Sequence, residues 1–585
     1  MGHQSPTQGA LPYKHTRAPS GSFSIMPLEC TARAGPSLHL PTYHILGTMH
    51  RVNNSNMTWP LAATDSNAIF ERHGLFHVMH QTPTTPPKLG QADYHASYGH
   101  VVSRDLIHWK RVRNSLDPGA SYDSHDGDCD GSVTLPFQSG FAQPLMSFGP
   151  DCARALPRRM PSSNDAPRVG FAKPADPTDP LLEDWIKDPQ NPISFGSSPP
   201  CSFSGHVWRD PHERGNTSLV CCINSDRNAW GRYTTNDPSL HGPWHLADPN
   251  FATWRQDSGE KQPRHPIGSI SGPSFVRLPP TASTDSGGAP PHSHMINALG
   301  GRAFAVGSYD AQNQTLAAFG SAQLVESVDS TANWFVAGEM ETDGRVLHIG
   351  FHAPGTPNAG ASTCLQWWPH SLVCPQTLIR SLTYDVGART LVSQPAAEYA
   401  NLRDRILARR RHVPVLRGVD EAVRLHPVNA GAEMDLELEV DIPADPTEPL
   451  HFGLHLLAPR QLVGRIPSPA TRVSVYLGPA RLAGDGARNG TLTVTSARGN
   501  ATGLVVRSQG ILVLPGEETI DLRILVDRSI VEVFAARGRA VASTRDYPAP
   551  EETGLWLWAA SPSTGPVRFR RVDAWSMACG WTDVL

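Results

Sequence analysis

Much of this chain is a long succession of short apolar runs that end at turn-forming residues. Between residues 41 and 395, runs such as 74–79, 219–223 and 303–306 are separated by Gly, Pro, Asn and Asp. Runs of this length are typical of strands joined by tight turns, as in a sandwich, a barrel or a propeller. The 50 Gly and 54 Pro among 585 residues make the chain rich in turns, yet they stay below the roughly 25–30% of a low-complexity chain.

The C-terminal part has a clearer pattern. Residues 434–442 alternate strictly between apolar side chains and Asp or Glu, which indicates a strand with one buried and one exposed face. The same period of two recurs at 473–477 and 522–526. Residues 421–585 are therefore predicted to form two antiparallel sheets packed face to face, a β-sandwich.

Two other segments complete the predicted organisation. Residues 1–40 are rich in Ser, Pro, Gly, His and Thr without periodicity, and we predict a disordered tail there. Residues 396–412 are the best candidate for a helix. We therefore predict a linker with a short helix over 396–420, between a catalytic domain at 41–395 and the sandwich.

The charge balance excludes several classes of function. The chain has a net charge of −4 at pH 7, and 18% of its residues are charged. It lacks the basic excess that releases counterions from nucleic acid, and it is too poor in charge for a coiled coil. Because no run of about 18 apolar residues occurs, no membrane span is predicted.

Sequence motifs for metals and cofactors are also missing. The chain has no HExxH, GxSxG, Walker or GxGxxG element. Residues 126–131 copy the start of an EF-hand loop, but the twelfth position of that loop is Phe137 rather than Glu. We therefore predict neither a metal nor a cofactor.

The cysteines and the glycosylation sequons indicate in which cellular compartment the protein resides. The nine cysteines form no CxxC pair, and their odd number leaves at least one thiol unpaired; Cys364 and Cys374 could close a short loop. Six N-x-[ST] sequons favour the secretory route, whereas residues 1–40 lack the apolar core of a signal peptide. We predict a secreted or vacuolar protein, with an intracellular protein as the alternative. The sequons are at Asn53, Asn56, Asn216, Asn313, Asn489 and Asn500.

Four polar segments beside predicted strands could carry chemistry. No single segment indicates a catalytic site. An Asp before a strand or in an Arg-Asp-Pro turn commonly forms the turn, and a carboxylate before a strand is commonly a surface group. Their order along the chain is the informative feature. They are residues 63–68 with Asp65, residues 98–109, residues 207–211 with Arg209 and Asp210, and residues 338–341 with Glu339 and Glu341.

Taken in this order, the segments resemble glycoside hydrolase family 32, the invertase and fructan-hydrolase family. The resemblance covers about 41–580 and implies an all-β fold, a five-bladed β-propeller followed by a C-terminal β-sandwich. Its boxes are the Asn-Asp-Pro-Asn box at 64–67, the Gly-His-x-x-Ser-x-Asp-Leu-x-x-Trp box at 99–109, a plant-type stretch at 172–185, the Arg-Asp-Pro box at 209–211 and the sandwich signature at 525–534.

The resemblance implies a retaining mechanism, in which two carboxyl groups about 5–5.5 Å apart cleave the glycosidic bond. Asp65 corresponds to the nucleophile, Glu339 to the acid/base, and Asp210 to the carboxylate that holds fructosyl hydroxyls and stabilises the transition state. Glu341 is a rival for the acid/base, because the sequence around Glu339 departs from the family pattern. The residues that would bind the fructosyl unit or keep the site charged are Asn67, Gln81, Asp130, Ser132 and Arg209.

The implied activity is the hydrolysis of terminal β-fructosyl groups from sucrose or a small fructo-oligosaccharide. A fructosyltransferase would use the same covalent intermediate with a sugar in place of water. The nucleophile box has lost its first Asn and its Pro, and the family's Trp three residues before the nucleophile is Ala62 here. These departures keep a non-catalytic carbohydrate-binding protein open as a third reading, although the joint presence of Asp65, Asp210 and Glu339 favours an enzyme.

Overall fold

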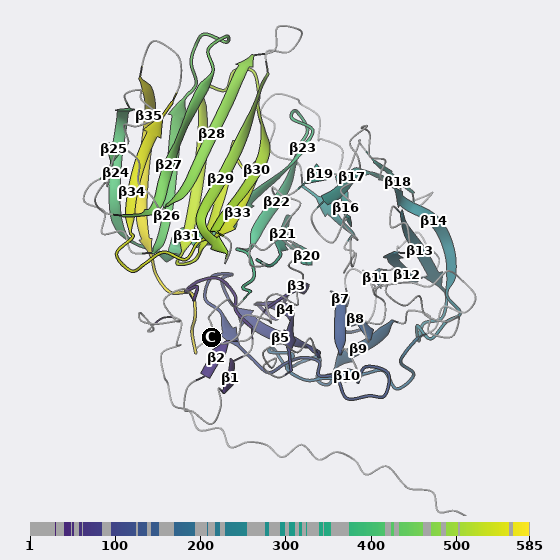
Figure 1. The fold of residues 1–585 in the computed structure, drawn as a ribbon. Helices are drawn as coiled ribbons and strands as arrows, with labels where there is room; N and C mark the ends of the chain where they lie inside the picture. The colour runs from purple at the N-terminus through teal and green to yellow at the C-terminus, as the bar shows by residue number, and fades with distance from the viewer. Residues whose placement is uncertain are drawn as a thin grey trace, which may run out of the picture.

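The fold was obtained as a computed structural model, which shows a propeller and a sandwich side by side (Figure 1). No helix in the part of the chain that it describes is long and apolar enough to cross a membrane. The structure describes residues 30, 40–47, 49–51, 58–60, 63–84, 95–124, 127–136, 142–150, 169–193, 207–208, 217–222, 229–253, 275–279, 293–298, 303–310, 315–318, 323–324, 338–342, 344–352, 374–415, 423–425, 432–459, 470–480, 487–500, 503–560, 566–583 and 585.

After the two-stranded sheet of β1 (Met49–Arg51) and β2 (Thr58–Pro60), the described part of the N-terminal region forms five antiparallel sheets, the blades of a propeller, each with four consecutive strands and one with a fifth. Blade 1 contains β3 (Ser66–Arg72), β4 (Leu75–Pro83), β5 (Ala96–Ser103) and β6 (Lys110–Arg111); blade 2 contains β7 (Asp128–Thr134), β8 (Leu145–Pro150), β9 (Gly170–Pro174) and β10 (Trp185–Lys187). Blade 3 contains β11 (Val207–Trp208), β12 (Thr217–Cys222), β13 (Ala229–Thr235) and β14 (His245–Thr253). Blade 4 contains β15 (Phe275–Leu278), β16 (Ser293–Ala298), β17 (Ala303–Asp310) and β18 (Thr315–Ala318), and β19 (Gln323–Leu324) also pairs with β17. Blade 5 contains β20 (Gly338–Thr342), β21 (Arg345–Ile349), β22 (Arg380–Asp385) and β23 (Thr390–Pro395).

The first strands of the blades form the inner ring of the propeller. Strand β3 packs beside β7, β7 beside β11, and β15 beside β20. Strand β20 of the last blade also packs beside β3 of the first, so the ring closes on itself. This arrangement confirms the predicted five-bladed propeller, in which closure leaves no blade without a neighbour.

Tight turns make the blades from short apolar runs. Strands β3 and β4 are joined by the two-residue loop His73-Gly74, and Arg72 pairs with Leu75 across it. Both loop residues have positive φ, 55° and 72°, as a type I′ hairpin turn requires. Val78 and Met79 on β4 are then fully buried between neighbouring blades and strands, which explains why the run 74–79 is apolar.

The C-terminal part is a sandwich of two six-stranded antiparallel sheets, as predicted. One sheet has the order β24 (Arg403–Val415), β35 (Val567–Met577), β26 (Glu433–Asp441), β31 (Thr519–Asp527), β32 (Ile530–Ala535) and β33 (Ala540–Arg545). The other has the order β25 (Val423–Arg424), β34 (Gly554–Ala559), β27 (Leu450–Ala458), β28 (Thr471–Ala480), β29 (Arg488–Asn500) and β30 (Gly503–Val513).

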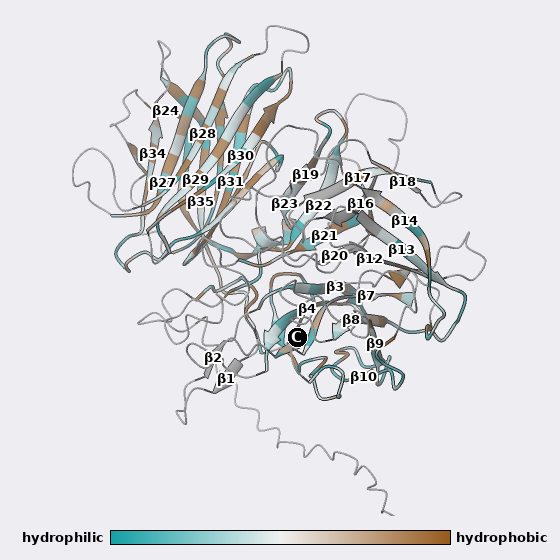
Figure 2. Cartoon of the chain, turned by 45° about the vertical axis from the view of Figure 1, so that its right-hand side comes forward, coloured by the Kyte–Doolittle hydropathy of each residue, from teal (hydrophilic) through white to brown (hydrophobic). Residues whose placement is uncertain are grey.

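The sandwich core comes from alternate residues of these strands. Leu436, Leu438 and Val440 of β26 are fully buried and pack against Phe452 and Val475 of the other sheet in one apolar cluster. Hydrophobic and hydrophilic residues alternate visibly along the sandwich strands (Figure 2). The period of two in the sequence thus marks the strand and the face that it buries.

The helix predicted over 396–412 is wrong in its second half. A short 3-10 helix, η3, spans Ala397–Leu402 and buries Tyr399 and Leu402. The chain then enters strand β24 at Arg403, so the sandwich begins earlier than 421. The reason is pairing over a long separation: β24 pairs with β35 along most of its length, and this partner lies outside any local sequence window.

The predicted tail over 1–40 also needs correction where the structure describes it. Cys30 forms a disulfide with Cys579, and Leu40 is buried in the propeller core. The other residues of that segment lie outside the described part of the chain. Cys129 and Cys374 are disulfide-bonded as well, whereas Cys364, proposed as a partner of Cys374, lies outside the described residues.

Before blade 1, strands β1 and β2 form an antiparallel pair.

Candidate active site

Asp65 lies directly before β3, at the inner ring of the propeller, and is half-buried. Its backbone is fixed against the neighbouring strand β4. The Thr64 amide donates to the Gln81 carbonyl at 2.9 Å, and the Gln81 amide donates to the Asp65 carbonyl at 2.9 Å. We call residues 63–66 the Asp65 loop.

A second contact holds the Asp65 loop from blade 5. Gln376 is fully buried, and its Nε2 donates to the carbonyl oxygens of Ala63 and Thr64, each at 2.8 Å. Ser66 Oγ donates in turn to Gln376 Oε1. Every polar group of the Gln376 side chain is therefore bonded to the loop: Nε2 to two backbone carbonyls before Asp65, and Oε1 to the Ser66 side chain after it.

Asn67 and Gln81 lie beside this loop and are 3% and 2% exposed. Neither polar atom of the Asn67 side chain has a hydrogen-bond partner among the described residues. A buried amide without partners destabilises a fold by about 1–3 kcal/mol, so such groups are commonly retained for a ligand. The substrate-binding role of Asn67 stays a prediction.

Of the other predicted residues, the described ones lie on two more inner strands, β7 and β20. Asp130 and Ser132 lie on β7; Ser132 Oγ is 3.2 Å from Ser147 Oγ, and the side chain of Asp130 lies outside the description. Strand β11 ends at Trp208, and the next two residues, Arg209 and Asp210, are outside the described residues.

Strand β20 carries both acid/base candidates. Glu339 pairs with His348 and Glu341 with Val346 of β21, and the two side chains themselves are not described. Residues two apart on a strand point to the same face, so the backbone does not separate the two glutamates by face. Because β20 packs beside β3, the strand with Glu339 and the strand that Asp65 precedes are neighbours in the inner ring.

The box at residues 99–109 has a structural role. Asp105 accepts hydrogen bonds from the amides of Ile107 at 3.1 Å and His108 at 2.8 Å, which closes a turn and directs Trp109 into the core, where it is 1% exposed. Gly99 is needed because a Cβ there would come within 2.3 Å of the His80 ring. This box builds blade 1 and supplies no acid to the inner ring.

Three buried histidines of blade 1 are unsuited to acid/base chemistry. His77 Nδ1 lies 3.0 Å from His100 Nε2. Burial lowers the pKa of His77 to about 3 and that of His80 to about 4, and it holds the pKa of His100 well below its usual range. All three are neutral near pH 7, so carboxyl groups remain the candidates for proton transfer.

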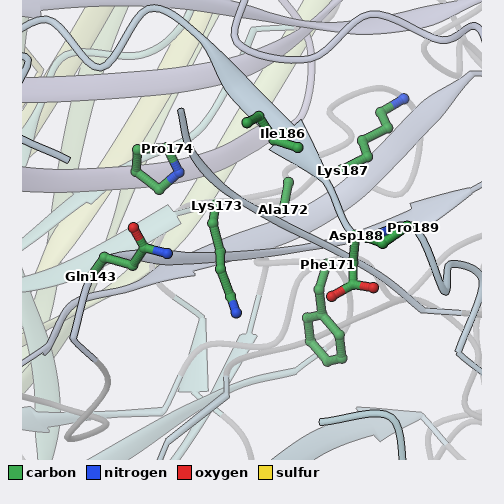
Figure 3. A pocket seen from close by; sticks show the side chains of 9 residues that line it. All are labelled: Gln143, Phe171, Ala172, Lys173, Pro174, Ile186, Lys187, Asp188 and Pro189. Carbon is green, nitrogen blue, oxygen red and sulfur yellow. The ribbon is translucent and has the colours of Figure 1, made fainter. Parts of the chain in front are cut away.

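A pocket of about 290 Å³ lies at the rim of blade 2 (Figure 3). It is lined by Ile186, Lys187 and Asp188, together with residues of β9. Strands β9 and β10 are the outer strands of their blade, so this pocket is separate from the inner ring. Lys187 also bonds the buried Asp123 and Asp128, each at 2.6 Å, which gives it a structural role.

Similar proteins were found along nearly the whole chain. The chain is 24% identical over 571 residues to "Beta-fructofuranosidase, insoluble isoenzyme 6" of Oryza sativa subsp. japonica, covering 88% of this chain and 87% of that protein. It is 26% identical over 537 residues to "6(G)-fructosyltransferase" of Asparagus officinalis, covering 82% and 80%.

Solved structures share the fold. The crystal structure of fructan 1-exohydrolase IIa from Cichorium intybus matches with a TM-score of 0.69 and 18% identity, over 93% of this chain and 98% of that one. The model of the "Glycosyl hydrolases family 32 N-terminal domain" matches residues 61–395, and that of the "Glycosyl hydrolases family 32 C terminal" matches residues 410–576. The propeller, the sandwich and both matches together place this chain in glycosyl hydrolase family 32.

Proposed function

We propose that the protein is a retaining glycosidase that releases terminal β-fructosyl units from sucrose or small fructans. The observation that carries the proposal is the adjacency of β20, with Glu339, and β3, which Asp65 precedes. Retaining hydrolysis needs two carboxyl groups about 5–5.5 Å apart, and two neighbouring inner strands can supply that spacing. Membership of family 32 supports the same chemistry.

In the first step, the Asp65 carboxylate attacks the anomeric carbon of the fructosyl unit, and a covalent fructosyl-enzyme ester forms. Glu339 donates its proton to the glycosidic oxygen as the bond to the leaving sugar breaks. In the second step, ionised Glu339 takes a proton from water, and the resulting hydroxide releases fructose from Asp65. The proton and the carboxylate are both restored.

The remaining residues would hold the fructosyl unit. Asn67 and Gln81 lie beside the Asp65 loop, and the unpartnered amide of Asn67 would hydrogen-bond ring hydroxyls. Asp210 would stabilise the positive charge of the transition state, and Arg209 would keep nearby carboxylates ionised. Asp130 and Ser132 would line the same site from β7.

The test is incubation of the purified protein with sucrose, with free glucose and free fructose measured separately. Equal release of both sugars is expected for hydrolysis. An excess of glucose would mean that fructosyl groups pass to sugar acceptors, which is the alternative function favoured by the likeness to a fructosyltransferase. No release from sucrose or from a short fructan would contradict an enzyme of this class.

We also propose that the protein is secreted or vacuolar. The described disulfide Cys30–Cys579 and the disulfide-bonded Cys129 and Cys374 support an oxidising compartment, because disulfides are rare in reducing ones. Localisation of the fluorescently tagged chain in its natural host tests this, and a purely cytosolic signal would contradict it.

A further inference from the structure

A buried group of charged side chains joins the sandwich to the propeller, and we name it the junction cluster. It lies where β31 and β32 of the sandwich meet the segment that leads into β22 of blade 5. Figure 1 shows blade 5 beside the sandwich, and β23 contacts β32. Every member is at most 1% exposed. The members are His44, His352, Arg380, Asp527 and Glu532.

Glu532 is the centre of the junction cluster. Its Oε1 accepts hydrogen bonds from His44 Nε2 at 3.2 Å, His352 Nε2 at 3.0 Å and the Leu378 amide at 2.9 Å. Its Oε2 accepts from Arg380 Nε at 3.2 Å and Nη2 at 2.7 Å. Burial would raise the pKa of Glu532, but Arg380 and the histidines hold it well below its usual range. One ionised sandwich residue therefore ties together three separate segments that lie outside the sandwich.

The same atoms resemble a metal site in composition. His44 Nε2, His352 Nε2 and Glu532 Oε1 lie within 4.8 Å of one another, and two imidazoles with a carboxylate are a known zinc set. However, Oε1 already accepts three hydrogen bonds, and the Arg380 guanidinium on the same carboxylate supplies the positive charge that a cation would bring. The cluster is a set of charge-assisted hydrogen bonds.

A chain of bonds runs from Glu532 to the Asp65 loop. Leu378 and Arg380, which Glu532 holds, follow Gln376 by two and four residues. Thr377 lies between Gln376 and Leu378. Its amide donates to the Gly350 carbonyl at 2.7 Å, and the Gly350 amide donates to Thr377 Oγ1 at 3.0 Å. The stretch 376–380 is thus fixed on both sides, and Gln376 in turn holds the Asp65 loop.

A second route reaches the same residue. The Gln376 amide donates to the Ile45 carbonyl at 2.8 Å, and Ile45 follows His44, which is bonded to Asp527 and Glu532. Both routes begin on carboxylates of the sandwich and end on Gln376. Removal of the Glu532 charge would loosen the first route directly and would weaken one of the two side-chain bonds of His44 in the second, while Asp527 keeps the other.

We propose that Glu532 of the sandwich is a positioning residue for the Asp65 carboxylate, acting through the segment 376–380 and the Gln376 side chain. The inference rests on the proposed function, in which Asp65 is the nucleophile. A nucleophile must be held to within about 0.5 Å of its productive position, and a backbone fixed by buried hydrogen bonds meets that demand. The sandwich would then contribute to the chemistry as well as to stability.

The test compares Glu532→Gln with Glu552→Gln. Glu552 is a matched control, because its carboxylate also pairs with an arginine, Arg498, and accepts a backbone amide, that of Ala549, at 2.6 Å. We expect kcat of Glu532→Gln on sucrose to fall by about 10- to 100-fold, with a smaller change in KM. The control should keep the wild-type kcat. Equal kcat values for the two variants, each measured below its unfolding temperature, would overturn the inference.

A double-mutant cycle tests the route. Gln376→Met keeps the side-chain length but removes the bonds to Ala63 and Thr64, and it should lower kcat to a similar degree. If Glu532 acts through Gln376, the kcat of the double variant should be little lower than that of either single variant, because both changes interrupt the same series of hydrogen bonds. Additive losses would contradict the route. If Glu532→Gln does not fold, Glu532→Asp replaces it: the shorter side chain keeps the charge but draws the carboxylate back from Leu378 and the histidines, so its kcat should still fall below that of Glu552→Asp.

A measurement without substrate separates this inference from the proposed function. The Ala63 amide donates to the Cys374 carbonyl at 2.9 Å, and the Thr64 amide to Gln81. Hydrogen exchange at these two amides should be faster in Glu532→Gln than in wild type or Glu552→Gln. Faster exchange in a chain without activity on any fructoside would refute the function and keep the positioning. Unchanged exchange would refute the positioning whatever the activity.

Discussion

Gln376 donates its side-chain amide to the Thr64 carbonyl at 2.8 Å, across 312 residues of sequence. This bond joins the last blade of the propeller to the loop that carries Asp65 in the first. Strand β20 of blade 5 also packs beside β3 of blade 1. The contacts that close the ring therefore also hold the candidate site together. Any change that opens this seam should affect activity as well as stability.

The first prediction concerns Asp65. Asp65→Asn keeps the shape of the side chain but removes its nucleophilic charge, so turnover of sucrose should fall by several powers of ten. Thermal unfolding should change little, because the loop is held by its backbone. A variant with full activity would defeat the proposed mechanism.

The second prediction separates the two glutamates of β20. Glu339→Gln should cripple hydrolysis of sucrose, yet the first step should persist with an activated fructoside whose leaving group needs no proton. Glu341→Gln serves as the control and should have a mild effect on both substrates. The opposite ranking would move the acid/base to Glu341.

The third prediction follows from the unpartnered amide of Asn67. Asn67→Leu should lower kcat/KM while raising the free energy of unfolding by about 1 kcal/mol, because an unsatisfied buried polar group is replaced by an apolar one. Asn191 is the matched control, since its side chain bonds both the amide and the carbonyl of Phe171, each at 2.9 Å. Asn191→Leu should lower the free energy of unfolding, as denaturant titrations can measure. Loss of stability in both variants would show that Asn67 has a structural partner.

The fourth prediction concerns pH and the junction cluster. His44 lies between two carboxylates, 2.8 Å from Asp527 Oδ2 and 3.2 Å from Glu532 Oε1. Burial alone would lower the pKa of His44, but hydrogen bonds to Asp527 and Glu532 outweigh it and raise the pKa above its ordinary value. Since a raised pKa means that the folded state holds the proton more tightly, His44 stabilises the fold fully below about pH 6.5. That contribution should disappear as the pH rises through the raised value.

Thermal unfolding from pH 6 to pH 9 would measure this effect. The rings of His352 and Tyr43 also face His44, and Arg380 pairs with Glu532, the second carboxylate that His44 contacts. The wild type should lose more stability over this range than His44→Gln, which carries no titrating group there. Equal slopes for the two proteins would show that His44 does not carry a proton in the cluster.

The fifth prediction concerns glycosylation. Asn489 of β29 is exposed and begins the sequon Asn489-Gly490-Thr491. In a secretory host, this site should carry a glycan, because the surface position leaves room for one. Mass spectrometry before and after endoglycosidase treatment would detect the change, and an unmodified peptide from the natural host would argue against the secretory route.

The fold class and much of the sandwich follow from local sequence patterns and from the family resemblance. The alternation at 434–442 follows from the geometry of a strand, in which every second side chain faces the core, and β26 buries the expected residues. The turn at His73-Gly74 is equally local, since two residues with positive φ suffice to reverse the chain. The segments with Asp65, Ser132 and Glu339 follow the chain order of the inner strands β3, β7 and β20.

Features that depend on partners far away in sequence became visible in the three-dimensional structure alone. The stretch 403–415 became a strand because β35 pairs with it and because Asp573 pairs with Arg411 at 2.7 Å; its local sequence favours a helix. Gln376 and His44 lie in none of the family boxes, and Glu532 lies in the sandwich signature, more than 460 residues from the nucleophile box in sequence. Their roles arise where the ring closes and the sandwich docks, because buried polar groups must find partners wherever the fold brings them.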